Sequence, residues 1–264
     1  VTPGLRVDYS AVGSQPVSDP ALNTVPGNTS TTYTNTPFSQ LNNKWLGKAT
    51  LSPRVGFNWD VNGNQSLVLR GGTGIFVGRM PFAWLGYAYT LNGTVYGNID
   101  YKPAAGTTVP LAVNPLYLKD TVAKYGGPGA SAQREVDLID NNFKLPTIWR
   151  SNIAADIKFG RGYKLTLDAM YTKTIYDVKF QQINIKDQVE YFSSGPTQTP
   201  VFVGGKLYDK YSNAYFLSNT KEGYRYNLTV QLSKTTNDIR VGKHALNMNW
   251  SAAYTYGMSK DLSN

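Results

Sequence analysis

The 264-residue chain contains no cysteine and a single histidine, His244. Disulfide frameworks and thiolate metal centres are therefore excluded, and so are zinc sites built from several histidines. Charged residues make up only 16% of the chain, and no apolar run has the length of a transmembrane helix. Aromatic residues reach 13%, which is too many for a disordered chain. An ordered chain that is not a helical membrane protein is expected.

The formal net charge of +9 raises the question of an anionic partner. The 26 lysines and arginines are scattered along the chain instead of forming a basic run. Such dispersed charge is typical of ordinary polar faces, so no nucleic-acid partner is predicted.

Alternation of apolar and polar residues recurs along the chain. Between 223 and 232, for example, Leu228 and Val230 fall on one face, and Asn227 and Thr229 fall on the other. A period of two residues predicts strands with one apolar and one polar face. The predicted strands cover 4–10, 51–61, 65–77, 149–159, 163–171, 223–232 and 246–256.

The connections between these strands alternate strictly in length. Short ones are predicted at 62–64, 160–162 and 235–242, and long ones at about 11–50, 78–144 and 177–222. Outer-membrane barrels have short periplasmic turns and long extracellular loops. The pattern therefore predicts an all-β fold, an antiparallel transmembrane β-barrel segment of about seven strands surrounded by outer-membrane lipid. The alternative is a secreted β-sandwich that binds carbohydrate, in which Leu167, Leu228 and Trp250 would face a soluble core.

Five stretches resemble a known family. They read LSPRVGFNWD at 51–60, LRGGTGIF at 69–76, LPTIWRSN at 145–152, AMYTKT at 169–174 and YTYGMSKD at 254–261. They are similar to the barrel strands of TonB-dependent outer-membrane receptors of the Oar-like and SusC/RagA-related type, which are common in Bacteroidetes. The resemblance covers most predicted strands and none of the long loops.

The resemblance implies a 22-stranded barrel that is energised by the TonB complex through an N-terminal plug and that imports a nutrient or a peptide. A surface lipoprotein is a further implied partner. Residues 1–264 are expected to form an interior segment of such a barrel, with the plug and the C-terminal strands outside it. Residence in the bacterial outer membrane follows from the same resemblance.

An aromatic segment directly after the third predicted strand is a candidate binding element. It contains Arg79, Phe82, Trp84, Tyr87 and Tyr89. One interpretation is a short helix or turn in the barrel mouth that presents these side chains to a ligand. The other is that they only pack the base of the loop.

Polar-face residues form the second candidate set. Arg54, Arg70, Arg150 and Arg225 are predicted to face the lumen together with Asp156. The arginines form either a basic track for anionic solutes or a network with Asp60, Asp156 and Asp168 that stiffens the wall. Buried charges need partners, which favours the network.

Acidic residues in the longest loop are a weak candidate for calcium. Glu135, Asp137 and Asp140 lie close in sequence, but their spacing matches no EF-hand, and a solvated loop is favoured. The glycines at 71–74 lack the lysine and hydroxyl residue of a phosphate loop. No catalytic constellation is found, so neither an enzyme nor a cofactor is predicted.

Overall fold

The computed structural model describes residues 1–11, 13–17, 19, 49–93, 97–98, 101–111, 114, 117–127, 131–132, 135–192, 198–242 and 244–262. Most of the predicted 11–50 loop lies outside these residues. Within them, the main sheet has nine strands, and a two-stranded β9–β10 sheet and a two-stranded β4–β5 sheet stand beside it. No helix of the described ranges is long and apolar enough to cross a membrane.

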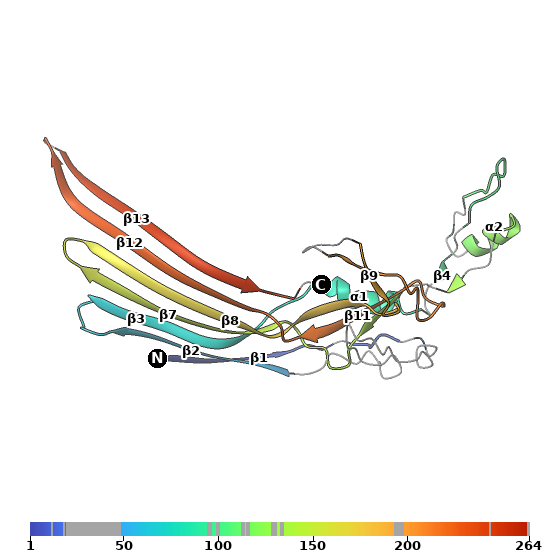
Figure 1. Ribbon diagram of the computed structural model, residues 1–264, viewed down its shortest axis with the longest axis horizontal. Helices are drawn as coiled ribbons and strands as arrows, with labels where there is room; N and C mark the ends of the chain where they lie inside the picture. Colours follow the sequence, from blue (N-terminus) through green and yellow to red (C-terminus); the bar gives the residue numbers. More distant parts are fainter. Residues whose placement is uncertain are drawn as a thin grey trace.

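Seven long antiparallel strands form a curved wall (Figure 1). In spatial order they are β1, β2, β3, β7, β8, β12 and β13. All seven predicted strands are present, and several are longer than expected. Their bounds are Thr2–Tyr9, Ala49–Asp60, Leu67–Val77, Thr147–Phe159, Tyr163–Gln182, Tyr224–Val241 and His244–Lys260.

The tight turns gather at one end of the wall, and the long connections extend from the other (Figure 1). The β7–β8 turn uses Gly160 and Gly162, both with positive φ, at 53° and 83°. The predicted 235–242 connection is wrong in extent, because β12 continues to Val241 and the chain turns at Gly242. A register shift after Thr236 lets this strand continue, so its loss of clean alternation reflects an irregular strand and not a loop.

The paired register separates an apolar face from a polar face. One row of partners reads Trp59, Leu69, Ala155, Leu167, Val230 and Tyr254, and the row beside it reads Asn58, Arg70, Ala154, Asp168, Thr229 and Thr255. No second sheet in the described part of the chain covers the apolar face. The side chains that the sandwich alternative would bury are exposed, with Leu167 at 39%, Leu228 at 51% and Trp250 at 39%. A β-sandwich is therefore excluded, and the barrel-wall fold is the one observed.

The long connections contain more regular structure than the sequence predicted. They hold α1 (Phe82–Thr90), β4 (Gly97–Asn98), α2 (Leu118–Lys124), β5 (Ser131–Ala132), β6 (Glu135–Ile139), β9 (Val189–Tyr191), β10 (Pro200–Phe202) and β11 (Asn213–Thr220). The prediction of a loop from 177 onward is wrong, because β8 continues to Gln182. Residues 177–182 pair with β11, and β11 pairs in parallel with β6. We call α1, β6, β11 and the end of β8 the outer unit.

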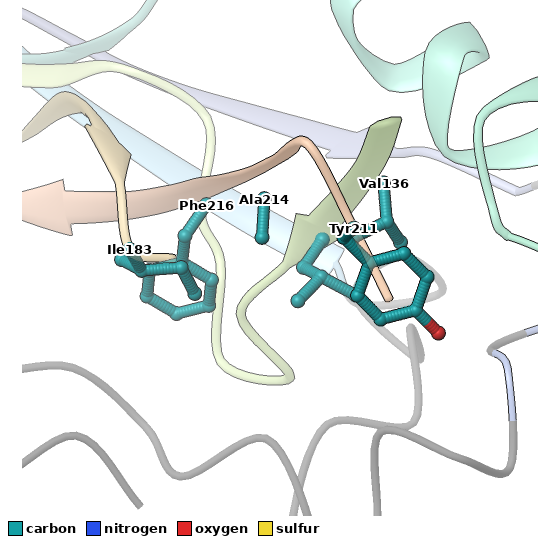
Figure 2. Packing of buried hydrophobic residues seen from close by; sticks show 6 residues of the cluster. Val136, Ile183, Tyr211, Ala214 and Phe216 are labelled. Atoms are coloured by element: carbon teal, nitrogen blue, oxygen red, sulfur yellow. The ribbon is translucent and has the colours of Figure 1, made fainter. Parts of the chain in front are cut away.

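Both faces of the outer unit bury apolar side chains. One cluster contains Val136, Leu138, Ile183, Tyr211, Ala214 and Phe216, drawn in Figure 2. The second cluster joins Leu85 and Ala88 of α1 to Ile139 and Leu217. Among the described residues, the side chains of the wall form no such cluster, so both apolar clusters lie in the outer unit.

A bulge in β8 determines which face each cluster occupies. Ile148 pairs with Thr174 and Thr147 pairs with Tyr176, so Ile175 is inserted. Beyond this point, even-numbered residues of β8 point to the apolar side. Phe180 is one of them, and it pairs with Leu217. Helix α1 therefore packs on the continuation of the apolar face, and the cluster of Figure 2 lies on the continuation of the polar face.

Candidate functional site

A row of arginines crosses the polar face of the wall. Arg54, Arg150 and Arg225 occupy one register row, on every second strand, with Gly74, Thr172 and Ser259 on the strands between them. Neighbouring strands lie about 4.8 Å apart, so the arginine backbones lie about 10 Å apart. The row presents three evenly spaced positive charges on one face.

Small residues between the arginines leave room for their side chains. A Cβ atom at Gly74 would lie 2.8 Å from Cγ of Arg54 and 3.0 Å from the carbonyl oxygen of Pro53. The Arg54 guanidinium lies over the ring of Phe76, 4.3 Å from its centre. Nε of Arg150 donates a hydrogen bond of 3.2 Å to Oγ1 of Thr172. Within the described residues, neither Arg54 nor Arg150 forms a salt bridge with a carboxylate.

The other two arginines of the predicted set are paired. Arg225 lies 3.0 Å from Oδ2 of Asp261. Nε of Arg70 lies 3.1 Å from Asp156, whose other carboxylate oxygen accepts a hydrogen bond of 2.7 Å from Thr166 and lies 3.2 Å from Nζ of Lys164. The polar face therefore carries a charge-paired network around Asp156 and, outside that network, the two arginines Arg54 and Arg150.

Of the other two acids expected in that network, Asp60 is used elsewhere. Its carboxylate accepts the backbone N–H of Gln65 at 2.9 Å and so closes the β2–β3 turn. Gln65 has a positive φ of 58°, and this bond helps to hold it there. Asp168 lies in the same register row of the polar face as Arg70, and the two residues are two strands apart.

Helix α1 carries the aromatic candidates, and the structure separates their roles. Phe82 is 69% exposed, and Arg79 is exposed just before the helix. Tyr89 packs against the second cluster and donates a hydrogen bond of 2.6 Å to the carbonyl oxygen of Ser14. Trp84 and Tyr87 line a cavity between the helix and the sheet. The helix prediction is confirmed, but α1 packs on the apolar side of the sheet, not the side that faces the lumen.

The cavity has a volume of about 260 Å³. Trp84 and Tyr87 line it from α1, Glu135 and Asp137 from β6, Phe180 from β8, and Tyr215 from β11. The remaining lining is aliphatic. Sequence reasoning missed Phe180 and Tyr215 because both lie in the predicted 177–222 loop. Phe180 lies between the polar residues Lys179 and Gln181, and this alternation was a pattern that could have revealed it, whereas Tyr215 lies between Ala214 and Phe216 and carries no such signal.

Asp137 has an unusual environment in this cavity. Its backbone N–H donates to the carbonyl oxygen of Leu91 at 2.8 Å, which holds β6 against the end of α1. Its Oδ1 atom is shielded from solvent and has no hydrogen-bond partner among the described residues. Burial, and then the neighbouring negative charge of Glu135, raise the pKa of the Asp137 carboxyl to about 7.

A buried polar contact ties the first long connection to the outer unit. Asp19 is 4% exposed, and its carboxylate accepts hydrogen bonds from Nζ of Lys210 and from the hydroxyl of Tyr211. Burial and the Asp19 charge raise the pKa of the Tyr211 phenol, which therefore stays protonated. The ring of Tyr211 belongs to the cluster of Figure 2, so this contact joins charge pairing to apolar packing.

The calcium interpretation gains no geometric support. Asp137 faces the cavity, whereas Asp140 follows the end of β6 and accepts the backbone N–H of Asn142 at 2.8 Å. In the described ranges, no three histidine, cysteine, aspartate or glutamate side chains form a group that could hold a metal ion.

Comparisons with known proteins find a similar solved structure and a matching family. A structural search finds the outer membrane transporter YddB from Escherichia coli, at 12% identity and a TM-score of 0.41. The match covers 81% of this chain and only 21% of the transporter, so the chain spans about a fifth of that protein. No curated protein matches. The model of a family described as "Outer membrane beta barrel domain" matches residues 1–263. The chain therefore belongs to the outer membrane β-barrel domain family and resides in the outer membrane.

Proposed function

We propose that this chain forms part of the wall of a TonB-dependent transporter or receptor of the SusC/RagA-related type, which binds and imports a nutrient or a peptide. In a family of outer-membrane barrels, the apolar face contacts lipid and the polar face lines the lumen. The observation that carries the proposal is the arginine row on that polar face. Arg54 and Arg150 have no carboxylate partner among the described residues, so they are available to a solute.

The chemistry of the row fits solutes that carry carboxylates. Arginine binds a carboxylate through two parallel hydrogen bonds, and a spacing of about 10 Å suits successive contacts along a wall. Every peptide ends in a carboxylate, so a peptide is a suitable cargo. The Asp156 network would keep the wall rigid around the row, with Arg70 and Lys164 holding its charge.

The proposed partners lie outside this segment. Coupling to the TonB complex would pass through a plug elsewhere in the whole protein, and a surface lipoprotein would cover the outer end. Outer-membrane lipid surrounds the apolar face. We propose no enzymatic step, no cofactor and no nucleic-acid partner for this chain.

The test of TonB coupling uses the full-length protein that contains this chain, purified in detergent. Its binding to the purified periplasmic domain of TonB from the same cell is measured by biolayer interferometry. We expect saturable binding, which a deletion of the region before the barrel abolishes. An absence of binding to the intact protein would show that the barrel works without TonB.

The arginine row is tested by uptake. Cells that express the full-length protein grow on a tryptic digest of casein as nitrogen source, and growth is compared between the native protein and the variant Arg54→Gln/Arg150→Gln. We expect at least a threefold slower growth of the double variant. Arg161→Gln, in the exposed β7–β8 turn, is the matched control and should grow normally. Equal growth of all three strains would remove the row from the import path.

A further inference from the structure

The cavity beneath α1 combines aromatic walls with negative charge. Two carboxylates, Glu135 and Asp137, line it together with Trp84, Tyr87, Phe180 and Tyr215, and none of the lining residues that the structure describes is basic. The chain as a whole has an excess of nine positive charges, so this local acidity runs against the composition. A cavity of this kind offers a cation both opposite charge and ring faces.

The aromatic rings are arranged as a wall. Phe180 stacks on Tyr215 with ring centres 5.1 Å apart and an interplanar angle of 19°. Trp84 approaches Phe180 from α1 with ring centres 6.1 Å apart. The negative face of an aromatic ring attracts ammonium and guanidinium groups within about 6 Å of its centre. Helix and sheet therefore contribute ring faces to one space.

The carboxylate of Asp137 lacks the partner that such a cation would supply. A shielded polar atom without a hydrogen bond costs a protein about 1–3 kcal/mol. Oδ1 of Asp137 is in that state among the described residues, and Asp137 lines the cavity. A cation that enters the cavity would lie beside this carboxylate and neutralise its charge.

We propose that the cavity between α1 and strands β6, β8 and β11 binds an organic cation, an ammonium or guanidinium group on a small apolar carrier. The volume of the cavity is about 260 Å³. Sites for drug-sized ligands have volumes of about 300–1,000 Å³, so this smaller cavity suits a group of the size of one side chain. A free amine and the side chain of a lysine or arginine share this chemistry.

The site is separate from the lumen. Asp137 pairs with Tyr215, and Phe180 and Leu217 continue the same face, which is the apolar side of the wall beyond the β8 bulge. A cation bound here would lie on the outside of the barrel, beyond the membrane. The proposal therefore does not rest on import or on TonB coupling.

The test is a calorimetric titration of the full-length protein in detergent at pH 8. The probes are choline, its neutral isostere 3,3-dimethylbutan-1-ol, and the amides of acetyl-lysine and acetyl-arginine. We expect at least one cation to bind and the isostere to bind at least tenfold more weakly. Binding of choline indicates a free small-molecule ammonium ligand, and binding of the amino-acid amides indicates a peptide or protein side chain.

Variants connect binding to the cavity. Asp137→Asn keeps the side-chain shape and should weaken cation binding at least tenfold, whereas Asp209→Asn, at an exposed position between β10 and β11, should leave it unchanged. Trp84→Leu, at a half-exposed position, should weaken it as well. Both cavity variants should still bind TonB as the native protein does, which separates a failure here from a failure of the transport proposal.

A pH series adds a readout that a purely structural role would not give. The carboxyls of Glu135 and Asp137 and the phenols of Tyr87 and Tyr215 line the cavity, and Asp137 titrates near pH 7. Choline keeps its charge at every pH, so its affinity should rise between pH 5.5 and 8 in the native protein and stay flat in Asp137→Asn. Equal binding of choline and its isostere, undiminished binding to Asp137→Asn, or no binding of any cation would overturn the proposal.

Discussion

The buried core of the outer unit makes one substitution especially informative. Phe216 is 1% exposed and belongs to the cluster in Figure 2, on β11 between β8 and β6. Replacement of a buried phenylalanine by alanine typically costs about 3–5 kcal/mol, because the lost transfer free energy is joined by the cost of a cavity. Phe216→Ala should therefore unfold the outer unit locally while the wall stays intact.

Hydrogen exchange measures this effect. An opening free energy reduced by about 3–5 kcal/mol raises the exchange of the amides of β11 and β6 by about two to three and a half powers of ten. Amides of β3 and β7, which do not pair with the outer unit, should keep their protection. The assay is hydrogen–deuterium exchange with mass spectrometry on the full-length protein in detergent.

Phe192→Ala is the control, because the same side chain is 86% exposed there, after β9. It should leave the exchange of β11 unchanged. The reasoning is refuted if both variants exchange alike, since the cluster would then contribute no stability. It is equally refuted if Phe216→Ala accelerates exchange throughout β3 and β7, because wall and outer unit would then unfold as one.

Three further predictions concern the wall and the cavity. Gly74→Ala should lower the thermal midpoint of the barrel in a heat-modifiability gel, because its Cβ atom would lie 2.8 Å from the side chain of Arg54. Gly4→Ala, on the other side of Arg54, is the control: its Cβ atom would have no atom within 4 Å, so the midpoint should not change. Leu228→Arg on the lipid face should cost up to about 2–4 kcal/mol in urea-dependent folding into vesicles, and Thr229→Arg on the polar face should cost less; equal costs would reverse the assignment of faces. The raised pKa of Asp137 means that the folded outer unit binds an extra proton between about pH 4 and 7. Its opening free energy, taken from exchange rates corrected for the intrinsic pH dependence, should therefore fall as pH rises from about 4 to 7 and level off above 7, and Asp137→Asn should lose this fall.

The membrane wall was predictable because its physics is periodic. Leu228 and Val230 must meet lipid and Thr229 must not, so each strand shows its alternation in the sequence. Strand β11 of the outer unit shows no such alternation in its sequence. Phe216 and Leu217 are adjacent and both buried, because the strand is covered on both faces, and an unbroken apolar pair shows no period of two residues.

The cavity could be predicted only in part, because its residues come from distant segments. Trp84 and Tyr87 stood out as an aromatic helix, but Tyr215 becomes their neighbour only through the parallel pairing of β11 with β6. Asp137 suggested a metal ligand from its acidic neighbours. Its actual surroundings depend on the β8 bulge at Ile175, a single inserted residue that no pattern in the sequence announces.

That bulge also determines how the molecule is built mechanically. Strand β8 has 20 residues, about twice the 9–11 needed to cross a membrane, and it runs unbroken from the wall into the outer unit. The wall and the outer unit therefore share one continuous strand and cannot move apart as independent bodies. The inserted Ile175 reverses which side chains of β8 face the apolar side, so this one residue determines that α1 packs on the outside of the wall and not on its lumen side.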